Sequence, residues 1–172
     1  MSRPPLDART LLARWTVGEW LIAVASTVMF VAVLLDWTTV SCHDSPLCGV
    51  ELSPVTGIHG WGWLTFAGVV VVVCVLLVRT ILAGEVRVPQ LAVSDPDLYA
   101  GLGGVELLGC LLFWLENPFT TIGPTTFGAG PGWYLALVAA AATVAGGRIM
   151  RAQTRPAEQL ELFDRSKSTS AG

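Results

Sequence analysis

Four long apolar runs divide this chain, and all ten of its Lys and Arg residues fall on one side of the pattern. The segments between runs one and two, and between runs three and four, contain no Lys or Arg. The cations are Arg3, Arg9, Arg14, Arg79, Arg87, Arg148, Arg151, Arg155, Arg165 and Lys167. Membrane insertion keeps Lys- and Arg-rich flanks in the cytoplasm, so this sorting predicts a polytopic membrane protein with both termini inside.

Composition favours the same class of protein. The chain is 53% hydrophobic and 13% charged, and its mean hydropathy is +0.63, whereas soluble domains carry about 25% charged residues. Its 172 residues suffice for one compact bundle. The strong preference for Arg over Lys, with abundant Ala, Val and Gly, indicates a GC-rich and bacterial genome.

Each apolar run is long enough to cross a bilayer as a helix, which takes about 20 largely apolar residues. The predicted spans cover about 16–37, 60–82, 98–115 and 132–150. The predicted fold class is all-α, a four-transmembrane-helix bundle in the cell membrane with an N-in/C-in topology. Residues 1–15 form a cytoplasmic segment, 16–150 the transmembrane domain, and 151–172 a largely disordered cytoplasmic tail.

Tryptophan placement is an independent indication of where the spans end. Amphipathic indole rings prefer the headgroup level of a membrane. The outer ends of the predicted spans carry Trp37, Trp61, Trp63, Trp114 and Trp133, and the inner end of the first carries Trp15 and Trp20. We therefore expect these rings to form two aromatic belts.

Small residues predict which spans touch. The fourth span carries Ala and Gly at intervals of four, and the third carries several Gly around an acidic residue. Small residues let helix backbones approach closely in lipid. The pattern predicts contact between spans three and four, although genome composition alone accounts equally well for the fourth span.

Glu106 is the one ionisable side chain near the middle of a span. Such residues are costly in the membrane and mark functional sites or buried polar contacts. Its neighbours at three and four residues' distance are mostly small, so we expect it to point into the bundle. One interpretation is a proton-carrying or substrate-binding carboxylate. The favoured interpretation is a protonated Glu that is hydrogen-bonded to a neighbouring helix.

Cys42 and Cys48 lie in the first outer loop, on either side of a Ser-Pro turn signal. Thiols outside the cytoplasm are normally oxidised, so a structural disulfide is the main prediction. A metal site through Cys42, His43 and Cys48 is the weaker alternative. Cys74 and Cys110 lie deep in spans two and three and are interpreted as small apolar core residues.

The segment Gly57-Ile58-His59-Gly60-Trp61-Gly62-Trp63, together with Asp36-Trp37, resembles a pattern in small uncharacterised four-span membrane proteins of GC-rich Gram-positive bacteria. The resemblance covers spans one and two and implies topology. Membrane thiol oxidases are also four-helix bundles, but their Cys-x-x-Cys pair is missing here. Small multidrug transporters carry their intramembrane Glu in the first span, not the third.

The tail carries a short motif, Gln159, Leu160, Glu161, Leu162 and Phe163. It resembles the peptide by which bacterial replication and repair proteins dock on the sliding clamp. The preferred interpretation is a juxtamembrane amphipathic turn that touches lipid or another helix. Under either interpretation, a cytoplasmic partner for the tail stays open.

The sequence contains no nucleotide-binding loop, metal-binding quartet or nucleophile–base pair. The prediction is a structural or partner-binding membrane protein that is not an enzyme and needs no cofactor. Its expected partners are the lipid bilayer and other membrane proteins or a second copy, with no nucleic acid. The alternative is a small transporter or channel subunit built around Glu106. A third class, an outer-loop redox or metal enzyme, would require a reactive thiol among the loop cysteines.

Overall fold

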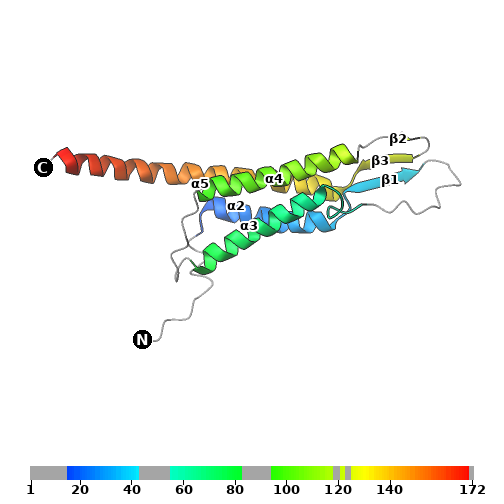
Figure 1. Ribbon diagram of the computed structural model, residues 1–172, viewed down its shortest axis with the longest axis horizontal. Coiled ribbons are helices and arrows are strands. Elements are labelled where there is room, and N and C mark those ends of the chain that lie inside the picture. Colours follow the sequence, from blue (N-terminus) through cyan, green and yellow to red (C-terminus); the bar gives the residue numbers. More distant parts are fainter. Residues whose placement is uncertain (1–14, 43–54, 83–93, 118–120, 123–124, 171–172) are drawn as a thin grey trace, which may run out of the picture.

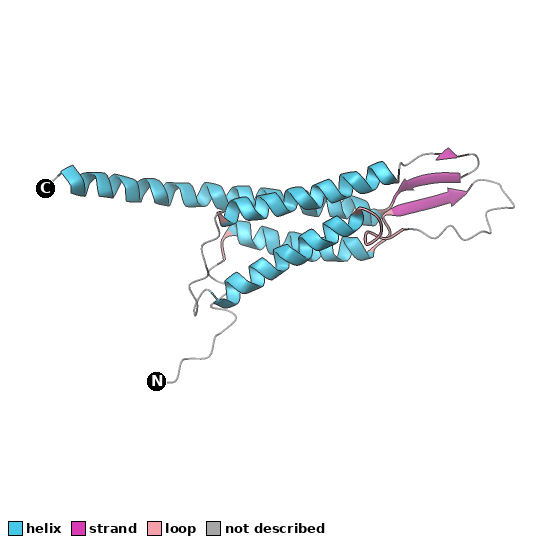
Figure 2. Ribbon diagram, viewed as in Figure 1, coloured by secondary structure: helices cyan, strands magenta, loops and turns pink. Residues whose placement is uncertain are grey.

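The computed structural model describes residues 15–42, 55–82, 94–117, 121–122 and 125–170, with side chains for all of these but 42, 81–82, 121–122, 125 and 154–170. The elements are α2 (Val17–Leu34), β1 (Thr38–Cys42), α3 (Gly62–Leu82), α4 (Asp95–Glu116), β2 (Thr121–Ile122), β3 (Thr125–Ala129) and α5 (Pro131–Ser170). The helices lie side by side and the strands project from one end of the bundle (Figures 1 and 2). We call this the sheet end.

Four helices are long and apolar enough to cross a membrane, which confirms the predicted number of candidate spans. The qualifying segments are Val17–Leu34, Gly62–Thr80, Asp95–Glu116 and Pro131–Gln153. The first ends earlier than predicted because the chain turns at Leu35 and enters a strand. The third begins earlier, because Ser94 stands at its N-cap position and Pro96 fits the first turn.

Local sequence explains how α2 begins. The Thr16 hydroxyl accepts a hydrogen bond from the Glu19 amide at 3.3 Å, and the Glu19 carboxylate accepts one from the Thr16 amide at 2.6 Å. This reciprocal capping box satisfies two amides that have no partner inside the helix. Glu19 therefore fixes the start of the helix.

The helices form a ring in which α5 packs closely against α2 and α4, and α3 packs against α4 and more sparsely against α2. The predicted contact between the third and fourth spans is present. Glycine makes it possible: a methyl group on Gly103 would lie 2.8 Å from the Val144 amide nitrogen of α5, and one on Gly147 would lie 2.7 Å from the Ala100 nitrogen of α4. The helix backbones thus approach at glycines, as expected for helices in lipid.

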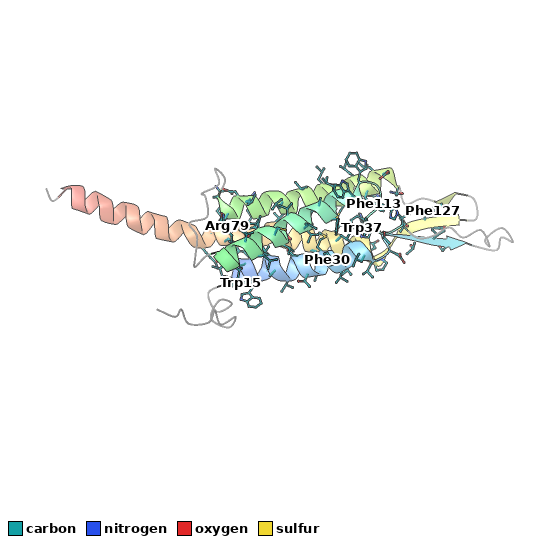
Figure 3. The ribbon with its side chains drawn as sticks, turned by 60° about the horizontal axis from the view of Figure 1, so that its bottom comes forward. Trp15, Phe30, Trp37, Arg79, Phe113 and Phe127 are labelled. Atoms are coloured by element: carbon teal, nitrogen blue, oxygen red, sulfur yellow. The ribbon has the colours of Figure 1, made fainter. Side chains whose placement is uncertain are left out.

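Ion pairs join the helices at the end opposite the strands. Arg79 of α3 pairs with Asp95 of α4, and Arg151 of α5 pairs with Asp97 of α4 at 2.7 Å. Both pairs are partly exposed, so each adds only about 0–1 kcal/mol to stability. Arg79 and Trp15 lie at this end, whereas Trp37 and Phe113 lie at the sheet end (Figure 3).

A small antiparallel sheet at the sheet end is an addition to the predicted all-α class. Its strand order is β1-β3-β2, so the connection after α2 and the connection between α4 and α5 share one sheet. β1 and β3 pair from Thr38↔Ala129 to Cys42↔Thr125. The sequence carries no clear signal for this sheet, because its strands are short and their pairing joins segments far apart in the chain.

One tryptophan does not belong to the predicted outer aromatic belt. Trp37 is fully buried, with its indole N–H donating to the Ala32 carbonyl oxygen at 2.8 Å and its ring edge-on to Phe113. Trp61, Trp63 and Trp114 are about half exposed, as expected for interfacial rings. Trp37 is instead the largest fully buried side chain described and anchors β1 to the bundle.

The backbone of α5 continues as one helix through Ser170, well past the bundle (Figure 1). This stretch includes the segment for which the sequence predicts a largely disordered tail. The disorder of that tail in solution stays a prediction.

Candidate functional site

Glu106 lies halfway along α4 and is fully buried. Its side chain faces α3 across Gly68, where an added methyl group would lie 2.8 Å from the Glu106 Cγ. On the other side it faces Thr143 of α5. The carboxyl group is therefore enclosed by three helices. It lies on the face of α4 that carries small residues and points into the bundle, as the sequence predicted.

Neither carboxyl oxygen of Glu106 has a hydrogen-bond partner among the described residues. The nearby hydroxyls donate elsewhere. Thr143 Oγ1 donates to the Ala139 carbonyl oxygen at 3.1 Å, and Thr65 Oγ1 donates to the backbone carbonyl of Glu106 itself at 3.1 Å. An unpartnered buried polar group is costly and rare. Among the buried polar side chains described, this carboxyl is the clearest candidate for chemistry.

No described Lys or Arg side chain lies beside Glu106. The segments Val17–Leu34 and Asp95–Glu116 contain no Lys or Arg, and the described cations of the other two helices lie toward the end of the bundle opposite the sheet. The titratable group nearest in sequence on the same face is the thiol of Cys110, which lies 3.8 Å from Thr65 Oγ1. The site is thus one carboxyl, one thiol and two hydroxyls in an apolar core.

The small sheet is a second candidate site, because its two faces differ. Cross-strand partners in an antiparallel ladder project to the same face. One face carries the exposed side chains of Thr39, Ser41 and Thr126, and the other carries the partly buried Val40 and Phe127. The sheet therefore presents a hydroxyl-bearing face to its surroundings.

Backbone hydrogen bonds fix this sheet to α2 and α5. The Gly130 amide donates to the Trp37 carbonyl at 2.8 Å, and the Gly132 amide donates to the Asp36 carbonyl at 3.0 Å. A methyl group on Gly132 would lie 2.7 Å from the Ala32 carbonyl oxygen, so only glycine permits this approach. The end of α2 and the beginning of α5 are held together where the sheet begins.

A carboxylate joins α3 to α4 at the same end. Glu116, at the last position of α4, accepts a hydrogen bond from the Trp61 amide at 3.1 Å, next to the start of α3. Gly60, which precedes Trp61, has a φ of +53°, a left-handed conformation that favours glycine. A negative charge at a helix N-terminus is favourable. All four helices are thus tied in pairs at the sheet end.

A shallow apolar groove of about 400 Å³ follows the sparse contact between α2 and α3. Its lining includes Ala23, Phe30, Val73 and Leu77, and the described lining contains no charged residue. Phe30 points outward midway along the bundle (Figure 3). This is the least packed side of the ring.

The other predicted site residues lie outside the described part. Cys48 is not described, and only the backbone of Cys42 is described, at the end of β1. Their disulfide therefore stays a prediction, as does the weaker metal site with His43. Gln159, Leu160, Leu162 and Phe163 lie on the extension of α5 without described side chains. Cys74 and Cys110 are free thiols; Cys110 is buried in the core as predicted, whereas Cys74 is exposed on α3, so its predicted core position is wrong.

Sequence reasoning found Glu106 but missed the roles of Trp37 and Glu116. The local sequence contains these glycines but does not indicate that Gly130 and Gly132 form hydrogen bonds with Trp37 and Asp36, which are far away in the chain. No protein-family model matches the chain, and comparison with curated proteins finds no match.

Proposed function

We propose that this chain is an integral protein of a bacterial cytoplasmic membrane, with both termini inside, and that its role is structural or partner-binding without enzymatic chemistry. Four apolar helices support membrane insertion. The described cations Arg79, Arg148 and Arg151 gather at the end opposite the sheet, which supports a cytoplasmic location for that end. The sheet then faces the outside.

The observation that carries the proposal is the tying of helix ends beneath the outer sheet. The residues just after α2 are bonded to Gly130 and Gly132 at the beginning of α5. The Trp61 amide, just before α3, is bonded to Glu116 at the end of α4. A transporter that alternates its access must separate helix ends at the outer mouth. A component that displays a binding surface gains from the opposite property, a surface held at a fixed position. The geometry therefore favours display over transport.

The surface that this proposal assigns to a partner is the hydroxyl-bearing face of the sheet, defined by Thr39, Ser41 and Thr126. Ser and Thr hydroxyls both donate and accept hydrogen bonds, so the face suits polar protein surfaces outside the membrane. The groove between α2 and α3 lies in the apolar part and is left to lipid.

Photo-crosslinking in native membranes tests the proposal. A photoreactive amino acid at Thr39 should yield a discrete protein adduct, identified by mass spectrometry and reproduced when the partner carries the tag. The matched control is Val138, which is 67% exposed on the apolar part of α5 and should yield lipid adducts only. Equal, unspecific crosslinking from Thr39 and Val138, or none from Thr39, Ser41 and Thr126, would contradict a partner-binding sheet.

A further inference from the structure

The polar groups around Glu106 offer lone pairs but no free hydrogen. A Thr hydroxyl has one hydrogen to donate and two lone pairs to accept with. Thr143 gives its hydrogen to the Ala139 carbonyl oxygen, and Thr65 gives its hydrogen to the Glu106 carbonyl oxygen. In this arrangement neither hydroxyl donates to the carboxyl, and of the two only that of Thr143 lies close enough to turn toward it. The surroundings instead match a group that brings its own hydrogen.

We propose that the Glu106 carboxyl is a proton-binding site in the middle of the bundle. It takes up one proton, so that the carboxylate becomes a carboxylic acid, and the new O–H donates to the hydroxyl oxygen of Thr143. This step converts a carboxyl that has no partner among the described residues into a donor facing an acceptor. It goes beyond the structural role proposed above and does not depend on it.

The surroundings fit a proton better than a metal ion. Hard cations take about six oxygen ligands in proteins, and this site offers one carboxyl and two hydroxyls. Gly68 lies so close to Glu106 that a single methyl group would contact its Cγ at 2.8 Å, which leaves little room for extra ligands. Among the described residues, no cluster of three or more acidic, His or Cys side chains could hold a metal ion.

The bundle also resists the changes that would solvate a carboxylate. α3 and α4 enclose the site and are tied at both ends, by the Trp61–Glu116 hydrogen bond and by the Arg79–Asp95 ion pair. Letting water reach Glu106 would require these helices to separate. The titratable side chain one turn further along the same face of α4 is the Cys110 thiol, a group that supplies no positive charge to compensate.

Infrared spectroscopy of the full-length protein in liposomes at neutral pH tests this inference. The difference spectrum between wild type and Glu106→Gln should contain the carbonyl stretch of a protonated carboxylic acid. The matched control, Glu116→Gln, should contain the bands of an ionised carboxylate, because Glu116 is exposed and accepts from an amide. Thr143→Val should shift the Glu106 band to higher frequency, because the acid loses its acceptor.

Carboxylate bands in the Glu106 difference spectrum would overturn the proposal. A protonated band that vanishes when sodium replaces choline at constant pH would overturn it in favour of a cation site. If Glu106→Gln fails to fold, wild type labelled with carbon-13 glutamate supplies the same readout. If every labelled glutamate shows the bands of an ionised carboxylate, the proton-binding proposal is also overturned. None of these outcomes bears on partner binding at the sheet.

Discussion

Gly103 and Gly104 are neighbours on α4 with opposite surroundings. A methyl group on Gly103 would lie 2.8 Å from a backbone nitrogen and 2.9 Å from a side-chain carbon of Val144, whereas one on Gly104 would meet nothing within 4 Å. Gly103→Ala should therefore push α4 from α5 and lower the free energy of unfolding by about 1–3 kcal/mol, as overpacking does.

Gly104→Ala is the matched control. It adds the same methyl group to the same helix, and alanine is the better helix former by about 0.5–1 kcal/mol. Its unfolding midpoint in detergent should stay level or rise. Equal destabilisation by the two substitutions would contradict the close approach of α4 and α5 at Gly103.

Trp37 gives a second prediction for a single side chain. Trp37→Phe removes the indole donor and leaves the Ala32 carbonyl oxygen without that partner in a buried site. Because the Leu35 amide still donates to the same oxygen at 3.2 Å, the loss should be about 0.5–1.5 kcal/mol, the net worth of one hydrogen bond. Trp63→Phe changes a ring that is 60% exposed, so its unfolding midpoint should scarcely move. Urea or thermal unfolding in micelles compares the two variants.

At the scale of elements, α3 depends on Glu116 for its first turn. Glu116→Ala removes the carboxylate that accepts from the Trp61 amide and should cost about 0.5–2 kcal/mol, the range for a lost helix cap. Hydrogen exchange should accelerate at the start of α3, while exchange at mid-α5 stays slow. Glu116→Gln keeps a carbonyl oxygen and should lose less protection. Unchanged exchange at the start of α3 in Glu116→Ala would exclude the capping role.

Sequence predicts the helices better than their connections. Long apolar runs, and Lys and Arg residues confined to alternate connections, can be read from short stretches of sequence. Four candidate spans could therefore be counted directly. The inward direction of Glu106 was also readable, because its neighbours at helical spacing are small. Which glycine of α4 meets α5 was not, since Gly103 contacts Val144 whereas Gly101 and Gly104 meet nothing within 4 Å. The sheet was not, since Thr38 pairs with Ala129 across most of the chain. The sequence placed Trp37 at the membrane interface, because indole rings favour the headgroup level. Its burial depends on tertiary packing, which the local sequence does not indicate.

For the whole molecule, the sorting of charge should decide orientation. The described residues with positive charge lie at one end of the bundle, and the sheet lies at the other (Figure 1). Each Lys or Arg near a span end disfavours translocation of that end. The ion pairs of Arg79 and Arg151 with Asp95 and Asp97 do not alter this bias, because acidic residues contribute little to it.

Cysteine labelling in intact cells measures this orientation. In a background with Cys42 and Cys48 replaced by serine, Thr39→Cys on the sheet should react with a membrane-impermeant maleimide. Gln153→Cys, exposed on α5 at the opposite end, should react only after the membrane is permeabilised. The free thiols of Cys74 and Cys110 lie in the apolar helices and set the background. Reaction of Gln153→Cys in intact cells would invert the topology. The hydroxyl-bearing face would then lie in the cytoplasm, and its partner would have to be sought there.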